Sequence, residues 1–402
     1  MPEENEATKK ATIRRLAASE VLNGESPLVL TATLVPVAGL DRFQPAGFPE
    51  VGHVIYKAPR GNGSVEPVCI VDSAASMANH LESVCMRGPH DLDLLPDLSG
   101  MPYLRCVTGD IAEGRLPGNR EAIVTSLTEG HRIASTYFLG ARNKQSGKWD
   151  GKGGQRVLAT GKICEKSFGD ELVAEFGVVL AESKRAHPPA AKWWDVFKTI
   201  SKYDPNALVH GVLFPQWQIK IPRVLTAHLE AFGAGRVDRS GVKFDRLGKT
   251  TSGQPIFAVD DATASEIRAT FVLDVALIRS FGREDDNKTL GLTSAQKEFL
   301  VALSLWKITK LLAAPFRFRS GCHLKLSSLR DHESEVEMDI NMPAAITAAG
   351  FRSSDADPNV VTDVFWPREE LYREAGVDEE ITVPPDDGQG GDAGDNGEDA
   401  NE

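Results

Sequence analysis

The chain has 402 residues, of which 41% are hydrophobic and 25% charged, so it can bury the core of one large domain or of two ordinary ones. No stretch is long and apolar enough to predict a membrane span, and the charged N-terminus does not resemble a signal peptide. We therefore expect a cytoplasmic protein without a membrane partner. The formal net charge of −12 at pH 7 argues at first against a nucleic-acid ligand.

Most of this charge lies in one segment. Residues Val377–Glu402 contain ten acidic side chains and no Lys or Arg, which leaves 45 basic and 47 acidic residues, a net charge of −2, in the rest of the chain. A nearly neutral body can still carry a basic face. The segment is rich in Gly, Asp, Asn and Pro, and this composition predicts a disordered acidic tail.

The cysteines predict neither disulfides nor a metal centre. Their count is odd and no CxxC pair occurs, so we expect reduced, buried thiols. Neither Cys85 with His90 nor Cys322 with His323 has the spacing of a zinc site. We expect no metal and no cofactor. The cysteines are Cys69, Cys85, Cys106, Cys164 and Cys322.

The first third of the chain predicts a helix over residues 8–23, a strand over Pro27–Val37 and a loop over Gly39–Gly52. A strand at Val68–Val71 then leads into a helix capped by Asp72 and Ser73. Apolar residues recur along this helix with helical spacing, from Ala74 to Cys85, and Asn79 and His80 lie on its polar side. Its N-terminus suits an anion such as a phosphate, although an ordinary capped core helix has the same pattern.

The middle of the chain is harder to interpret. Arg87–Asn119 is rich in Pro and Gly and predicts irregular structure. Ser126 and Glu129 have the spacing of a capping box, after which His131 and Arg132 project from a short helix. A His-Arg pair can serve catalysis, a phosphate or a buried hydrogen bond.

Arg142–Arg156 contains five basic residues, including Lys148 and Lys152, together with one acid and four glycines. Such a flexible basic loop with Trp149 suits an arm that follows a nucleic-acid backbone, although a solvated loop fits equally well. Neither GKWDGKGG nor Gly248-Lys249-Thr250 meets the spacing of a phosphate-binding P-loop.

From Val209 to Ile221 the pattern is strand-like, and a helix over Val224–Phe232 is predicted after Arg223. A turn-rich piece follows in which five basic residues face two acids. The basic residues are Arg236, Arg239, Lys243, Arg246 and Lys249.

The last structured third alternates clearly. Glu266–Arg279 predicts a half-buried strand, and Thr293 with Gln296 predicts a capping box for a helix to Ala313. The stretch FRFRSGCHLKLSSL then places apolar side chains on one face and basic ones on the other. A sheet with one basic face is typical of ferredoxin-like RNA-binding domains. The residues of this basic face are Arg317, Arg319, His323 and Lys325.

The order of strand, helix, long insertion, strand, helix and strand predicts an α+β protein with a split ferredoxin-like (RRM-like) palm. We assign residues 1–89 and 256–376 to this fold, 90–255 to the insertion, and 377–402 to the tail.

Four stretches, DSAASMANHLE, TSLTEGHRIAS, DPNALVHGVLF…PRVLTAHLEAFGAG and FRFRSGCHLKL, span most of residues 70–325. Their order and spacing resemble the RAMP-superfamily backbone subunit ("Cas seven" group) of the CRISPR Cascade effector complex, subtype I-G (formerly I-U). His80 stands where this resemblance leads us to expect arginine.

The resemblance implies that residues 1–89 and 256–376 form a ferredoxin-like palm and residues 90–255 its finger and thumb. It also implies that copies of the chain stack along a CRISPR RNA and present it to target DNA. The implied partners are the guide, target DNA through the guide, further copies, other Cascade subunits and a recruited helicase-nuclease. The resemblance suggests contacts by six residues, Asn79, Arg132, Arg223, Lys243, Arg317 and Arg319. The basic loop and the basic strand face add Lys148, Lys152 and Lys325.

Two other functions fit the sequence. A RAMP-type ribonuclease on the same scaffold has Asp150, Asp245 and His131 as candidate catalytic residues, although no carboxylate cluster is visible. An unrelated metabolic enzyme could use Gly248-Lys249-Thr250. We expect a binding protein rather than an enzyme, and RNA that co-purifies with the protein distinguishes the three.

Overall fold

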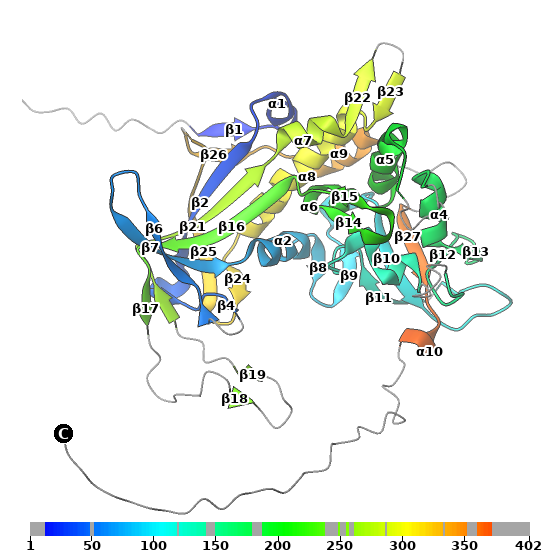
Figure 1. Cartoon of the computed structure of the whole chain (residues 1–402), viewed down its shortest axis with the longest axis horizontal. Helices are drawn as coiled ribbons and strands as arrows, with labels where there is room; N and C mark the ends of the chain where they lie inside the picture. The colour runs from blue at the N-terminus through cyan, green and yellow to red at the C-terminus, as the bar shows by residue number, and fades with distance from the viewer. Residues whose placement is uncertain are drawn as a thin grey trace, which may run out of the picture.

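The computed structural model describes residues 13–48, 52–118, 120–141, 149–178, 187–237, 248–249, 255–256, 261–285, 288–332, 334–351 and 360–371 (Figure 1). Two main sheets lie on either side of a central helix, α2. The α+β class predicted from the sequence is confirmed. The predicted acidic tail lies outside the described residues.

The larger sheet has seven antiparallel strands and curls into a half-barrel (Figure 1). Side chains alternate along it, so Leu30, Ala32 and Leu34 are buried with Phe271 and Ala269 opposite them, as period-two patterning requires. In spatial order the strands are β24 (Phe316–Arg319), β25 (Cys322–Arg330), β2 (Leu28–Pro36), β21 (Glu266–Leu273), β16 (Leu225–Phe232), β7 (Val65–Asp72) and β6 (Ile55–Pro59).

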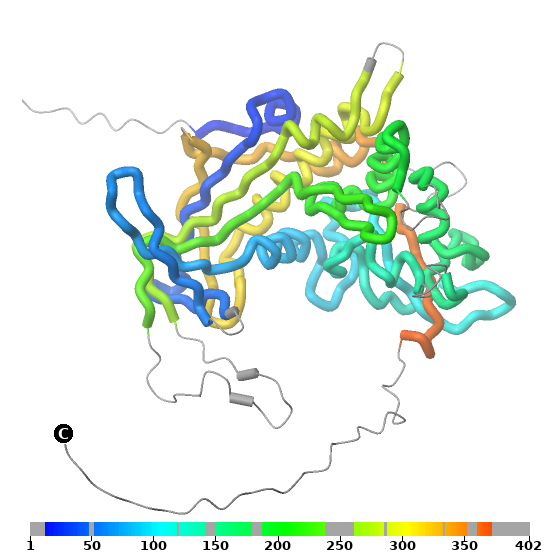
Figure 2. Tube along the Cα trace, viewed as in Figure 1, coloured from blue at the N-terminus to red at the C-terminus, as the bar shows by residue number. Residues whose placement is uncertain are grey.

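The second sheet has five strands. Its strand β27 comes from near the C-terminal end of the described chain and runs parallel to β10, as the orange segment in Figure 2 shows. In spatial order the strands are β11 (Glu121–Thr125), β10 (Tyr103–Thr108), β27 (Val361–Phe365), β12 (Gln155–Val157) and β13 (Ile163–Ser167).

Helix α8 is buried along most of its length and packs against α1, α2, α6, α7 and α9. It begins with the predicted capping box of Thr293 and Gln296, which is confirmed, and Phe299, Leu303 and Trp306 of this helix are buried. The α-helices are α1 (Ala18–Asn23), α2 (Ala74–Ser83), α3 (Thr136–Leu139), α4 (Phe168–Glu175), α5 (Trp193–Tyr203), α6 (Pro205–His210), α7 (Val275–Ser280), α8 (Ser294–Leu312), α9 (Met342–Ala349) and α10 (Arg368–Leu371). The 3-10 helices are η1 (Val37–Gly39), η2 (Pro96–Leu98), η3 (Arg132–Ala134), η4 (Ala190–Lys192) and η5 (Pro215–Trp217).

Short strands complete the fold. They pair as β1 (Arg14–Leu16) with β26 (Val336–Met338), β4 (Gly47–Phe48) with β5 (Gly52–His53), β8 (Met86–Gly88) with β9 (Asp91–Leu94), β14 (Val212–Phe214) with β15 (Ile219–Ile221), β18 (Gly248–Lys249) with β19 (Pro255–Ile256), β22 (Gly282–Asp285) with β23 (Lys288–Gly291), and β20 (Asp261–Thr263) with both β17 (Gly235–Val237) and β3 (Arg42–Phe43).

Several predicted elements are wrong because long-range pairing outweighs local preference. The predicted helix over 8–23 contains strand β1 before α1 begins, because β1 pairs with β26. The predicted helix Val224–Phe232 is strand β16, which pairs with β21 on one side and β7 on the other. Ala, Leu and Glu favour helices, but tertiary context overrides that preference.

The prediction of irregular structure over Arg87–Asn119 is wrong, since it contains η2 and strands β9 and β10. The capping box at Ser126 and Glu129 is also wrong. Ser126 follows strand β11, and its hydroxyl accepts the Leu104 amide of β10 instead. Ser135 is the residue that caps the helix α3.

Three strand predictions are correct only in part. The pattern over Val209–Ile221 begins in α6 and continues as the β14–β15 hairpin. The strand predicted over Glu266–Arg279 ends at Leu273, because Asp274 caps α7. The alternating stretch after Phe316 is a hairpin, β24–β25, with its turn at Ser320 and Gly321.

Two strands cross the predicted boundaries between palm and insertion. β16 belongs to the larger sheet although it was assigned to the insertion, and β27 belongs to the smaller sheet although it was assigned to the palm. No disulfide forms among the described residues, and Cys69, Cys85, Cys106 and Cys322 are buried, as predicted.

Candidate nucleic-acid interface

Helix α2 follows directly from β7. The Ser73 hydroxyl accepts the Ser76 amide at 3.1 Å, which confirms the predicted N-cap. Met77 and Leu81 on the predicted apolar face are fully buried. The opposite side of the helix, which includes Asn79, is therefore available for a ligand.

The first turn of α2 is organised around the buried carboxylate of Asp72. The Nε2 atom of His80 lies 2.9 Å from it, the Ser76 hydroxyl donates to it at 3.0 Å, and Arg319 forms an ion pair with it at 2.6 Å. Burial alone would raise the pKa of Asp72, but the His80 hydrogen bond and the Arg319 charge outweigh this and lower it.

This arrangement corrects the prediction for Arg319. A bulge between Arg317 and Arg319 turns the second side chain away from the basic face and toward Asp72. Its charge is already paired, so we no longer count it among the RNA contacts. His80 is likewise occupied by Asp72 and lies edge-on to Phe316 and Phe318.

Arg132 is also an interior residue. Its side chain donates from Nε and Nη2 to the two carboxylate oxygens of Glu82, both at 2.7 Å, and from Nη1 to the Gly211 carbonyl at 3.2 Å. It is 6% exposed and has a left-handed φ of 54°, a backbone conformation that costs energy. The contact with RNA that the resemblance suggested for Arg132 is not available in this conformation.

The pair of Glu82 and Arg132 is part of a buried polar cluster. Asn206 donates to Glu82 at 2.7 Å, and Lys307 donates to Asn206 Oδ1 and to His210 Nε2, the latter at 2.9 Å. The members are Glu82 of α2, Arg132 of η3, Asn206 and His210 of α6, and Lys307 of α8. Sequence reasoning missed this cluster; the one signal was a lysine inside the apolar run of α8.

Burial controls the ionisation of these groups. It lowers the pKa of His210 well below its usual value, an effect that the charge of Lys307 reinforces. It also lowers the pKa of Lys307. Burial and the charge of Glu82 raise the pKa of the neighbouring Asp204 to about 7.

A basic pocket of about 410 Å³ lies above this cluster, at the end of α6 and the β14–β15 hairpin. Lys220 and Arg223 are exposed at it, and Arg223 reaches within 3.5 Å of the Ala74 carbonyl of α2. None of the described residues that line this pocket carries a carboxylate. The titratable side chains of the lining are His131, Arg132, His210, Lys220 and Arg223.

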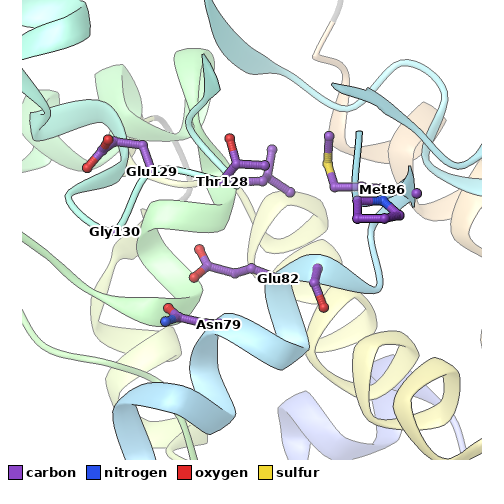
Figure 3. A pocket seen from close by; sticks show the side chains of 10 residues that line it. Asn79, Glu82, Met86, Thr128, Glu129 and Gly130 are labelled. Carbon is purple, nitrogen blue, oxygen red and sulfur yellow. The ribbon is translucent and has the colours of Figure 1, made fainter. Parts of the chain in front are cut away.

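A second pocket of about 450 Å³, the Asn79 pocket, adjoins the basic one, and Gly130 lines both. Figure 3 shows Asn79 and Glu82 on α2 across from Thr128, Glu129 and Gly130. Glu82 lines this pocket and Arg132 lines the basic one, so the ion pair separates them. The predicted residues Asn79 and Arg223 therefore line two neighbouring pockets that share Gly130.

The family model described as CRISPR-associated protein GSU0053 (Cas_GSU0053) matches residues 28–236, just over half of the chain. The chain belongs to this CRISPR-associated family. No curated protein matches it. Membership implies a role in CRISPR defence, and the matched range includes α2, both pockets and most of the buried polar cluster.

This CRISPR-associated chain has a second accessible basic group on the outer face of its larger sheet. Arg317, His323 and Lys325 are exposed there, as the alternation predicted, with Arg317 opposite His323 in the β24–β25 hairpin. Phe318 and Leu324 point to the other, buried face. These three residues are called the outer-face group below.

The remaining predicted residues are spread elsewhere. Lys152 forms an ion pair with Glu370 at 3.1 Å and its side chain stays 48% exposed, so its contact with RNA remains a prediction. The Trp149 indole donates to the Gly153 carbonyl. Lys148, Lys243 and Asp245 lie outside the described residues. Gly248-Lys249 forms strand β18 rather than a helix start.

The described residues give no metal-binding group of His, Cys, Asp and Glu side chains. Asp150 accepts the Lys152 amide at 2.9 Å in a local turn. Among the helices that the structure describes, none is both long and apolar enough to span a membrane.

Proposed function

We propose that this chain is the RNA-binding backbone subunit of a type I Cascade complex, subtype I-G, which holds a CRISPR RNA and presents it for pairing with target DNA. The observation that carries the proposal is the basic pocket, where Lys220 and Arg223 are exposed beside α2 and the described lining has no carboxylate. Family membership supplies the link to CRISPR defence.

The chemistry supports a guide holder. A guide must be gripped without regard to its sequence, so the protein contacts phosphates and riboses and leaves the base edges free. Exposed cations around α2 and amide or hydroxyl side chains such as Asn79 and Ser83 match those needs.

The strand order also supports a ferredoxin-like palm. Within the larger sheet and its helices, β2, α2, β16, β21, α8 and β25 follow the order β–α–β–β–α–β. The five-stranded sheet, apart from β27, then comes from the insertion between α2 and β16. Copies of such a subunit add to one another through heterologous contacts, which propagate along a guide.

RNA binding by a double variant, Lys220→Ala with Arg223→Ala, tests the proposal. Each lost phosphate contact lowers the slope of log affinity against log salt by about 0.7, so the double variant should lose about 1.4 in slope and bind at least tenfold more weakly at low salt. The matched control, Lys162→Ala with Lys166→Ala, removes two exposed lysines at edge strand β13, one just before the strand and one within it.

Equal losses in the two double variants would show non-specific attraction and contradict the proposal. Sedimentation on RNAs of increasing length tests assembly, and we expect more copies on longer RNA. A single copy on a long RNA would contradict a backbone role. Co-purified RNA of defined length, together with a helicase-nuclease partner, would support it.

A ribonuclease is the second candidate. The exposed His131 lies 3.2 Å from Glu129 beside the basic pocket, and such a pair can orient a general base. We expect no cleavage of labelled RNA, with or without divalent metal. Cleavage abolished by His131→Ala or Asp150→Ala would favour the enzyme instead.

A further inference from the structure

The hairpin of strands β6 and β7 extends beyond the larger sheet as an arm. Strand β16 pairs with β7 only from Val68 onward, so the earlier residues of β7 pair with β6 alone among the described strands. Figure 1 shows the arm projecting at one end of the sheet. One side of the arm is held in place, because Arg60 forms an ion pair with Glu66 at 2.6 Å and lies over the ring of Phe232. The arm is therefore pre-organised for a contact.

The other side of the arm is largely apolar and exposed. Pro59 lies opposite Val65, and Lys57 lies opposite Pro67, so these four residues share one side of the hairpin. All four are exposed, and Val65 is 58% exposed. The Lys57 ammonium group has no ion pair within the part of the chain that the structure describes. Prolines on both strands disfavour the addition of a further strand, so a partner would contact the side chains instead. We call these four residues the arm face.

A groove of about 300 Å³ lies elsewhere, where α1, α8 and α9 meet. Seven of its lining residues are alanines, whose small side chains leave a hollow between the helices, and Phe299 and Ile340 add apolar surface. Two carboxylates, Glu298 and Asp339, line the same groove. Neither carboxylate has an ion pair or a hydrogen bond to its side chain within the described ranges. The groove therefore complements the arm face in both polarity and charge.

The arm face and the groove do not meet within one chain, since the arm projects away from α1, α8 and α9 (Figure 1). We propose that the arm face of one copy packs into the groove of the next copy, with its apolar side chains against the alanines and Lys57 near Glu298 and Asp339. Such a contact joins two different surfaces, so each added copy leaves one arm and one groove free for the next. The contact rests on the proposed function only for the RNA that brings the copies together.

Cross-linking between two variants of the full-length protein tests the contact. One variant carries Val65→Cys in the arm face, and the other carries Ala344→Cys at an exposed position of the groove. Both also carry Cys164→Ser, because the other native cysteines are buried and therefore inert. On a long RNA, a short bis-maleimide should link the mixed variants into heterodimers, whereas either variant alone should give no dimer.

The controls decide between this contact and its alternatives. Ile111, on the loop between β10 and β11, is 52% exposed and matches Val65 as an exposed apolar residue. Ile111→Cys mixed with Ala344→Cys should give no heterodimer, and an equal yield would contradict a specific contact. Dimers of Val65→Cys alone would show that two arms pair with each other, which would overturn the assignment to the groove.

Exchange of charges across the contact provides a second readout. Lys57→Glu in the Val65→Cys chain brings like charges together and should lower the heterodimer yield at least about fivefold. Asp339→Lys in the Ala344→Cys chain restores opposite charges and should recover most of the yield. The matched control replaces Asp339→Lys by Glu165→Lys, an exposed site on β13, and should recover none. Equal yields in all three mixtures would contradict the pairing of Lys57 with the groove.

The same reaction in nuclease-treated protein separates the contact from the proposed function. Heterodimers at high protein concentration without RNA would support the contact even if the chain failed to bind RNA. Several copies on one RNA without any heterodimer would leave the proposed function standing and remove the contact. The absence of heterodimers both with and without RNA would also overturn the contact.

Discussion

The buried polar cluster and the outer-face group both contain basic side chains, but those of the cluster are buried and those of the outer face are exposed. In the cluster, Arg132 is 6% exposed and forms a bidentate ion pair with Glu82. On the outer face, Arg317 is exposed, and within the part of the chain that the structure describes its guanidinium has a hydrogen bond only to the Ser320 hydroxyl, at 2.8 Å. An arginine is therefore available to a ligand only where the fold has not brought a carboxylate to it.

The comparison also separates stability from binding. A buried pair loses several kcal/mol when one partner is removed, because the other charge stays buried and unpaired. An exposed basic side chain contributes little to folding, but its charge attracts phosphates through solvent. Substitutions of paired and of exposed charged side chains test this division, and the largest effect is expected in the buried polar cluster.

Substitution of Glu82 by Ala should destabilise the fold by about 3–5 kcal/mol, because Arg132 and Asn206 lose their buried acceptor. Chemical denaturation gives the free energy of unfolding. The matched control is Glu165→Ala, an exposed carboxylate on β13, which should change stability by no more than about 0.5 kcal/mol. Equal small effects in both variants would show that the cluster is not a structural unit.

Asp204 tests the electrostatics of the same region. Its pKa is raised to about 7, so between pH 4 and 7 the folded state keeps a proton that the unfolded state has lost. Stability due to this group therefore falls as pH rises through that window. Asp204→Asn removes the effect and keeps a side-chain oxygen for the Ala207 amide.

Between pH 4 and pH 8, the free energy of unfolding of Asp204→Asn should rise by up to about 4 kcal/mol relative to that of wild type, at 1.36 kcal/mol per pKa unit. The measurement is the free energy of unfolding of both proteins at several pH values. The lowered pKa of His210 has the opposite effect on stability, which is lost as pH falls. Because both proteins contain His210, this contribution cancels when their free energies of unfolding are subtracted. A pH-independent difference would contradict the raised pKa.

Local signals in the sequence predicted the elements that are defined by local contacts. Helix α8 was correct because its capping box and apolar spacing lie within one continuous stretch. Strand β16 was missed because its composition favours a helix and its partners, β7 and β21, are remote in sequence. Strand β10 was missed for the same reason, since its parallel partner β27 lies about 250 residues later.

The candidate site was predictable to the same extent. Asn79 and Arg223, two of the residues that the resemblance suggested, are exposed and line neighbouring pockets, and their contact with RNA stays a prediction. The roles of Arg132 and Arg319 were not predictable, because their carboxylate partners Glu82 and Asp72 are 50 or more residues away. Periodicity shows which face a side chain takes but not which charge it meets.

Arg317 and Arg319 test the comparison within one hairpin. Arg319→Ala removes the ion pair of the buried Asp72 and should cost about 1–3 kcal/mol, whereas Arg317→Ala should stay within about 0.5 kcal/mol of wild type. Arg317→Ala combined with Lys325→Ala should weaken RNA binding several-fold at low salt. A large stability loss from Arg317→Ala would place that residue with the structural arginines.

The smallest expected effect concerns the acidic tail. Deletion of Val377–Glu402 removes ten carboxylates and no cation, so it makes the chain more attractive to RNA. The effect should be a modest gain in RNA affinity, because charges more than about 8 Å apart are screened at physiological salt.

The measurement is the RNA affinity of the full-length and the truncated protein at two salt concentrations. The gain from truncation should fade as salt rises, while the free energy of unfolding stays the same, because a segment of this composition cannot join an apolar core. The truncation starts after Phe365 and Trp366, which pack in or against the core, so it leaves the smaller sheet intact. Weaker RNA binding after truncation at both salt concentrations would show that the tail contacts a neighbouring copy or a partner. The exposed basic groups would then not be the only charged surfaces that this chain uses for assembly.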